Sequence, residues 1–146
     1  MDLRMRVRRE GEIVVVEVGG EIDLHSAPQL RAELMKATEP IKATEITQNA
    51  DSGSIENAKS GLTDTVLRGP RVVVDLADVF FIDSTGIGVL VGALKRARER
   101  NGALHFCNSQ SRVRRVFEIT GLMRALPLFD SREAALAGFS VEEEKS

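Results

Sequence analysis

Asp83, Ser84 and Thr85 place one carboxylate and two hydroxyls next to one another in the stretch FFIDSTGIGVL, residues 80–90. Apolar residues at helical spacing follow them, which predicts that a helix begins at Asp83 or Ser84. The first amide groups of a helix lack partners within it, and either side chain can accept a hydrogen bond from them. Capping alone explains one such residue. Three in succession predict that at least one hydroxyl faces solvent.

A solvent-facing serine at a helix start can carry a phosphate, because the helix dipole and the free amides favour added negative charge. A protein docked across the same turn would meet about two new negative charges beside Asp83, and repulsion and desolvation would weaken that interface. Gly86 and Gly88 fall in the first turn, although glycine costs about 1 kcal/mol relative to alanine within a helix. We expect them to form a small-residue face that lets a partner's backbone approach closely.

Residues for catalysis or metal binding are not assembled in this sequence. The two histidines, His25 and His105, have no cysteine or second histidine at ligand spacing, so we expect no metal site. DSTG differs from the G-x-S-x-G of serine hydrolases, and the glycines near it spell neither a Walker loop nor G-x-G-x-x-G. Thr85 stands where an aspartyl-phosphate enzyme has its second acid. We therefore expect no catalytic residues, no enzymatic activity and no cofactor.

Composition predicts a single domain over residues 1–146. The chain has 42% hydrophobic and only 4% aromatic residues, so its core is built mainly from aliphatic side chains. The formal charge of -2 gives no general attraction to nucleic acid or to anionic membranes. The single cysteine, Cys107, excludes an internal disulfide. No apolar run is as long as a membrane span and no signal-peptide core is present, which predicts a cytoplasmic protein.

The first forty residues predict a hairpin followed by a helix. Apolar residues alternate with arginines over 3–8, and a β-branched run follows at about 12–18, which indicates two antiparallel strands. We expect Gly19-Gly20 to end the second strand. The S-x-x-Q pattern from Ser26 to Gln29 is a capping box for a helix that runs to about Ala37.

Residues 39–65 differ in composition from the rest of the chain, with few large apolar groups and many Thr, Ser, Asn and Gly. We interpret them as an inserted polar segment, because a connection of this length without its own core is unusual in a compact domain. Lengthening a loop costs little entropy, so a tolerated surface insertion is the simplest interpretation. An added binding epitope is the alternative.

The second half alternates strands and helices. The run RVVVDL at 71–76 is apolar throughout, which is typical of a strand buried on both faces of a parallel sheet. We expect a helix from the DST stretch to about 100, a strand at about 103–108, a helix ending near 121, a short edge strand at 125–130, and a final helix from the capping box Asp130–Glu133 to about Phe139. Lys95, Arg96, Arg98 and Arg100 lie opposite the apolar residues of their helix and indicate a solvated face. The element order β-β-α-(insert)-β-α-β-α-β-α predicts an α/β fold with a mixed sheet.

Three motifs together make the resemblance to a known family specific. They are GEID at Gly20–Asp23, VVVDLADVFFIDSTGIGVLV at Val72–Val91 and VRRVFEITGL at Val113–Leu122. With these motifs the chain resembles the STAS-domain anti-sigma factor antagonists of bacteria over nearly all of its length except 39–65. The resemblance implies a STAS-like sheet with helices and a partner-switching function without catalysis.

The resemblance also implies a site and its partners. In this family the serine after the motif Asp, here Ser84, is phosphorylated by an anti-sigma factor that is also an ATP-dependent serine kinase. The unmodified antagonist binds that kinase and frees the sigma factor, and a PP2C-type phosphatase resets the cycle. Asp23 is expected near Ser84, and Thr85 is the second hydroxyl rather than the acceptor. The expected partner-binding residues are Asp23, Asp83, Ser84, Thr85, Gly86, Ile87 and Gly88.

Two other functions are compatible with the same sequence. The first is a STAS scaffold or ligand-binding module of a stress-sensing or lipid-transport complex, in which the same surface docks a protein that is not a kinase. The second is a nucleotide-binding or nucleotide-hydrolysing domain, which predicts that the isolated protein binds ATP or GTP. The long insertion departs from the family pattern and leaves the identity of the partner open.

Overall fold

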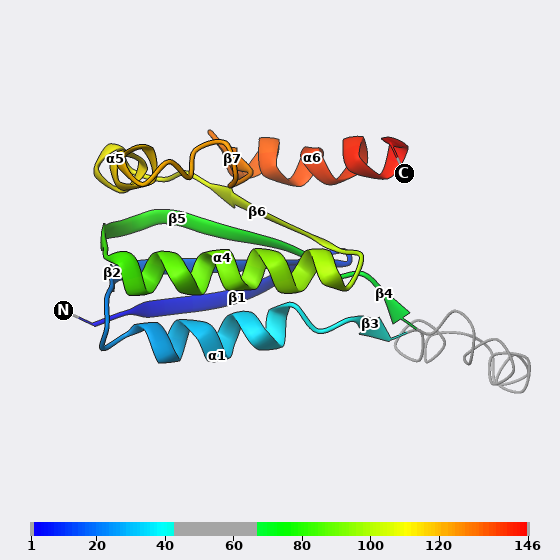
Figure 1. The fold of residues 1–146 in the computed structure, drawn as a ribbon. Helices are drawn as coiled ribbons and strands as arrows, with labels where there is room; N and C mark the ends of the chain where they lie inside the picture. Colours follow the sequence, from blue (N-terminus) through cyan, green and yellow to red (C-terminus); the bar gives the residue numbers. More distant parts are fainter. Residues whose placement is uncertain (1, 43–66, 146) are drawn as a thin grey trace, which may run out of the picture.

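The computed structural model describes residues 2–42 and 67–145, which form one five-stranded sheet covered by helices on both faces (Figure 1). The sheet has the order β1-β2-β5-β6-β7; β1 is antiparallel to β2, and the other neighbours are parallel. The elements are β1 (Arg4–Glu10), β2 (Ile13–Ile22), α1 (Ala27–Ala37), β5 (Arg71–Ile82), α4 (Ser84–Glu99), β6 (Ala103–Cys107), α5 (Ser111–Ile119), β7 (Leu128–Phe129) and α6 (Arg132–Lys145). This arrangement confirms the predicted mixed α/β fold.

Most of the insertion predicted at 39–65 lies outside the described residues. At its edges, β3 (Ile41–Lys42) pairs antiparallel with β4 (Leu67–Arg68) in a separate two-stranded sheet. No helix in the two described ranges is both long enough and apolar enough to cross a membrane.

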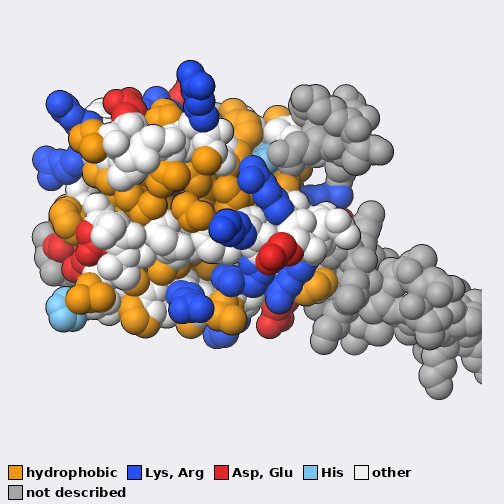
Figure 2. Space-filling view, in the orientation of Figure 1, with side chains coloured by type: hydrophobic (Ala, Val, Ile, Leu, Met, Phe, Trp, Pro, Cys, Tyr) orange, Lys and Arg blue, Asp and Glu red, His pale blue; other side chains and the backbone are white. Residues whose placement is uncertain are grey.

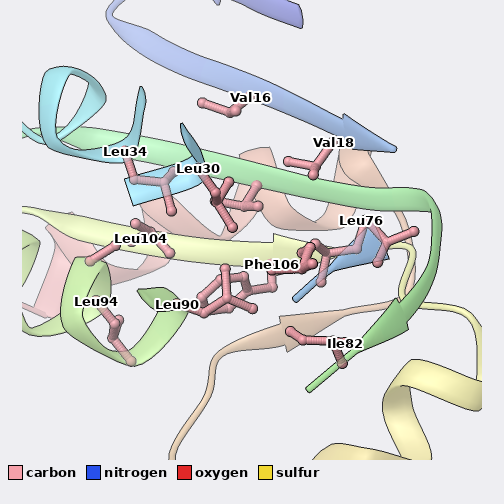
Figure 3. Packing of buried hydrophobic residues seen from close by; sticks show 14 of the residues in the cluster. Val16, Val18, Leu30, Leu34, Leu76, Ile82, Leu90, Leu94, Leu104 and Phe106 are labelled. Atoms are coloured by element: carbon pink, nitrogen blue, oxygen red, sulfur yellow. The ribbon is translucent and has the colours of Figure 1, made fainter. Parts of the chain in front are cut away.

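Alternation along the strands divides the buried side chains between the two faces of the sheet. Val16 and Phe106 point to the face covered by α1, α4 and α5, where they pack with Leu30 and Leu90 (Figure 3), and Val74 belongs to the same cluster. Val15, Val73 and Cys107 occupy the opposite face, under Ala135 and Phe139 of α6. Residues 72–76 of β5 are therefore buried on both faces, as their continuous apolar run predicted.

The basic cluster of α4 lies largely in solvent, as its pattern predicted. Lys95, Arg98 and Arg100 are exposed, and Lys and Arg side chains are visible over the outward side of α1 and α4 (Figure 2). Two members of the cluster also hold the end of α1: Arg96 Nε donates to the Thr38 hydroxyl at 3.2 Å, and Arg100 donates to the Thr38 carbonyl at 2.7 Å. The two helices are thus tied together at the end far from the DST stretch.

The expected end of the second strand at Gly19-Gly20 is wrong. Strand β2 continues to Ile22, with register shifts against β5 around both glycines. Gly20 has a φ of 98°, a conformation that glycine adopts without strain, and a Cβ there would lie 2.3 Å from the Asp2 carbonyl oxygen. The glycines therefore form an irregularity within the strand. Strand β5 is also longer than predicted and ends at Ile82, in register with Ile22.

Neither predicted capping box forms. Ser26 has a helical φ and makes no capping bond, because its hydroxyl is used in the preceding loop. At α6 the cap is Ser131, whose Oγ accepts from Ala134 N at 3.1 Å, while Asp130 pairs with Arg114 at 3.1 Å. Helix α6 then runs to Lys145 instead of ending at Phe139.

A charge network joins the start of α6 to the sheet. Arg132 donates to Asp75 on β5 at 2.8 Å and also to Glu17 on β2. Asp75 is 7% exposed and accepts further hydrogen bonds from Ala77 N and the Asn108 amide. The hydrogen bond from Arg132 holds the pKa of Glu17 below its ordinary range.

Candidate functional site

The candidate site lies where β2 and β5 end side by side. Because Ile22 and Ile82 are in register, the residues that follow them, Asp23 and Asp83, leave the same edge of the sheet. The Asp83 amide donates to the Ile22 carbonyl at 3.0 Å and so closes the pairing. Helices α1 and α4 both begin at this end of the molecule, on the left in Figure 1.

Asp83 caps α4 and also binds the neighbouring loop. Its Oδ1 accepts from Gly86 N at 2.9 Å, which confirms the predicted cap. Its Oδ2 accepts from Leu24 N at 3.1 Å. One carboxylate therefore fixes the position of both segments at the end of the sheet.

Asp23 organises the loop between β2 and α1. Its Oδ1 accepts from His25 N at 3.0 Å and from Ser26 N at 2.9 Å, and its own amide donates to Ser26 Oγ at 2.9 Å. Ser26 Oγ in turn donates to the Glu21 carbonyl at 2.7 Å. The hydrogen bonds to Asp23 from Ser26, its amide foremost, and from the His25 amide hold the pKa of Asp23 below its ordinary value. Asp23 is therefore a fixed negative charge at neutral pH.

Ser84 and Thr85 follow the cap in the first turn of α4, and both are exposed. Since Asp83 supplies the cap, neither hydroxyl is needed for it, and neither has a hydrogen-bond partner among the described residues. The expectation that a hydroxyl faces solvent is confirmed. The bond between Leu24 and Asp83 brings the loop that contains Asp23 beside this turn.

The glycines of the first turn do not share one face, so the expected small-residue face is wrong. Gly86 is buried, and a Cβ there would lie 2.5 Å from Ile22 Cγ2 and 2.9 Å from the Ile22 carbonyl oxygen. Ile87 is also buried, at 7% exposure. Gly88 is exposed, and a Cβ there would meet nothing within 4 Å. Of these three predicted partner-binding residues, only Gly88 lies on the surface.

The two glycines give a matched pair of predictions. Gly86→Ala is expected to lower the free energy of unfolding by about 2 kcal/mol, because the new methyl group overlaps Ile22. Gly88→Ala is expected to raise it by about 1 kcal/mol, because alanine favours the helix and has open space there. Urea unfolding of both variants measures the two changes. Equal changes would contradict the inward and outward assignments.

The STAS domain family matches residues 4–135, most of the chain. The chain belongs to the STAS domain family. This agrees with the motifs that carry the sequence resemblance.

Three proteins similar to this STAS domain are named as anti-sigma factor antagonists. An anti-sigma-B factor antagonist of Bacillus subtilis (strain 168) is 34% identical over 122 residues, which are 84% of this chain and 86% of the relative. An anti-sigma factor antagonist from Mycobacterium paratuberculosis shares the fold with a TM-score of 0.66 and 22% identity, over 95% of each chain. The anti-sigma factor antagonist SpoIIAA in its unphosphorylated form has a TM-score of 0.58 and 23% identity, over 91% of this chain and 93% of SpoIIAA. The phosphorylated form of SpoIIAA has also been solved.

Two large apolar side chains of the STAS domain were missed by sequence reasoning. Leu24 is 65% exposed and donates its amide to Asp83, and Phe81, two residues before Asp83, is 43% exposed. Phe81 stands in an apolar run that is typical of a core strand, and Leu24 stands in a short loop, so neither pattern signals exposure. Figure 2 shows hydrophobic and acidic side chains next to each other at this end of the molecule, on the left.

Two potentially reactive side chains away from this site, His105 and Cys107, are buried in the core of the STAS domain. His105 Nδ1 lies 2.8 Å from the Ala135 carbonyl oxygen, and its ring stacks on Phe139 at 4.0 Å. Burial raises the pKa of the Cys107 thiol to about 12, so it is not a nucleophile at neutral pH. Within residues 2–42 and 67–145, no three His, Cys, Asp or Glu side chains are grouped to hold a metal ion.

Proposed function

We propose that this chain is an anti-sigma factor antagonist. Its unphosphorylated form binds an anti-sigma factor and thereby releases a sigma factor, and phosphorylation of Ser84 abolishes that binding. The names of relatives at 34% identity over most of both chains support the class of function. An antagonist acts by binding, and this function is consistent with the expectation that the chain is not an enzyme.

The observation that carries the proposal is the exposed hydroxyl of Ser84. It is the first residue of α4, and Asp83 makes the capping bond in its place. A phosphate on Ser84 therefore breaks no hydrogen bond of the described fold, and the helix dipole favours its charge. The same phosphate would add about two negative charges beside Asp83 and Asp23. The domain keeps its fold while its partner is repelled.

The proposal includes the enzymes that set the state of Ser84. The anti-sigma factor acts as the serine kinase, and a PP2C-type phosphatase removes the phosphate. That SpoIIAA exists in unphosphorylated and phosphorylated forms on the same fold supports a modification that leaves the domain folded. We propose that residues 1–146 are one cytoplasmic STAS domain in which 39–65 is an insertion. A role as a scaffold or ligand-binding module is not favoured, since the matched relatives are named as antagonists.

A pull-down from a cell extract tests the proposal. Wild type and Ser84→Ala are expected to recover an anti-sigma factor with a serine kinase domain, and Ser84→Asp is expected to recover much less of it. Mass spectrometry of the captured proteins identifies the partner. Recovery of scaffold or transport proteins alone, with the same yield from all three forms, would overturn the proposal.

A further inference from the structure

Leu24 and Phe81 are large apolar side chains that are exposed in the described part of the chain. They are 65% and 43% exposed, and neither belongs to the two core clusters of the described chain. Single exposed apolar residues are ordinary on protein surfaces. These two, however, stand at the same end of the sheet: Phe81 is next to the last residue of β5, and the Leu24 amide binds Asp83, the cap of the turn that contains Ser84.

The backbone around both side chains is held in place. The Leu24 amide donates to Asp83 Oδ2 at 3.1 Å, and Phe81 lies in β5 in register with Glu21. Asp23 fixes the loop that follows Leu24 through its bonds to two backbone amides. A partner that buries these side chains would therefore pay little to order the backbone that carries them.

The charged residues in the two segments that carry these side chains are of one sign. Residues 21–26 and 80–85 contain three carboxylates, those of Glu21, Asp23 and Asp83, and no Lys or Arg. An apolar centre surrounded by charged residues is the usual arrangement of a protein interface. Electrostatic complementarity then requires a partner with an apolar pocket bordered by Lys or Arg.

We propose that Leu24 and Phe81 are the apolar anchors by which this chain docks into a pocket, bordered by basic residues, on the protein that responds to the state of Ser84. The inference rests on the proposed function and adds the residues and the chemistry of contact. It also explains why one phosphate is sufficient to abolish binding, because the new charge joins the three carboxylates of these two segments and would have to be buried against the same pocket.

Isothermal titration of the purified full-length chain with the anti-sigma factor recovered by the wild type tests this inference. Leu24→Ala and Phe81→Ala are each expected to weaken binding about tenfold, because each removes apolar area that docking buries. Leu24→Ala is expected to unfold as the wild type does, since Leu24 is 65% exposed, whereas Phe81→Ala is expected to unfold at a slightly lower temperature and to remain folded during the titration, since Phe81 is 43% exposed. Met35→Ala is the matched control: Met35 is 46% exposed, and it lies on α1 about 12 Å past the start of that helix. It should bind as the wild type does.

The outcomes separate this inference from the proposed function. Wild-type affinity in both anchor variants, together with loss of binding in Ser84→Asp, would overturn the anchors and leave the proposed function standing. An equal loss of affinity in Met35→Ala would also overturn the anchors. Any exposed apolar side chain would then contribute to binding, whatever its position. If the wild type recovers no anti-sigma factor, the proposed function fails and the anchors fail with it.

Discussion

Ser84→Asp is expected to weaken binding to the anti-sigma factor about a hundredfold without destabilising the domain. Like charges brought together in an interface cost several kcal/mol, and the new carboxylate stands beside Asp83 and near Asp23. In the free domain the same charge is placed in the first turn of α4, where the helix dipole stabilises it by about 0.5 kcal/mol. Thermal unfolding should therefore be unchanged or slightly raised, while titration calorimetry records the loss of affinity.

Ser111→Asp is the matched control for this charge. Ser111 is also exposed and is also the first residue of a helix, α5, at another place on the surface. It should gain the same small stabilisation and bind the anti-sigma factor as the wild type does. A comparable loss of binding in both variants would mean that total charge matters and that its position at Ser84 does not.

Arg132→Met is expected to lower the free energy of unfolding by about 3 kcal/mol. Asp75 is 7% exposed, and without Arg132 its carboxylate would remain buried without a cation. Glu17 would lose its shortest contact with a cation and keep Arg8 at 3.1 Å. Urea unfolding of the variant beside the wild type measures the change.

Arg114→Met is the control for Arg132→Met. Arg114 also pairs with an aspartate, but the Asp130 side chain is 90% exposed, and exposed ion pairs contribute less than about 1 kcal/mol. If Arg114→Met lowered the free energy of unfolding as much as Arg132→Met, burial of Asp75 would not explain the effect.

The same network predicts a dependence of stability on acid. The pKa of Glu17 is lower in the folded chain than its ordinary value of 4.5, chiefly because of the hydrogen bond from Arg132. The contribution of Glu17 to the free energy of unfolding is therefore complete above pH 4.5. It is lost as the pH falls through the lowered pKa of the folded chain. The free energy of unfolding, measured at a series of decreasing pH values, should decline less steeply in Glu17→Gln than in the wild type. Equal slopes would contradict a role for this carboxylate.

Local patterns predicted the parts of the fold that depend on neighbouring residues. Helix α4 follows from apolar residues at helical spacing, and its cap follows from Asp83 standing immediately before them. The continuous apolar run of β5 predicted a strand buried on both faces, and the structure places its alternate side chains in two separate clusters. In each case the cause lies within a few residues of the effect.

Features that depend on distant parts of the chain were not predicted. Gly86 points inward because the end of β2, at Ile22, packs against it, and no pattern near Gly86 contains that information. The pair of Glu17 and Arg132 joins residues 115 positions apart. Ser26 stands in a sequence pattern typical of a helix cap, yet its hydroxyl bonds to the backbone of Asp23 and Glu21 in the preceding loop. Tertiary contacts decided each of these cases.

The exposed hydroxyl at Ser84 is the claim on which the proposed switch depends, and a kinase assay tests it most directly. The purified wild-type chain is incubated with ATP and the anti-sigma factor that it recovers, and the modified residue is located by mass spectrometry. We predict a single phosphate on Ser84 that is absent from Ser84→Ala. An unmodified chain, or a phosphate confined to another residue such as Thr85, would contradict the account.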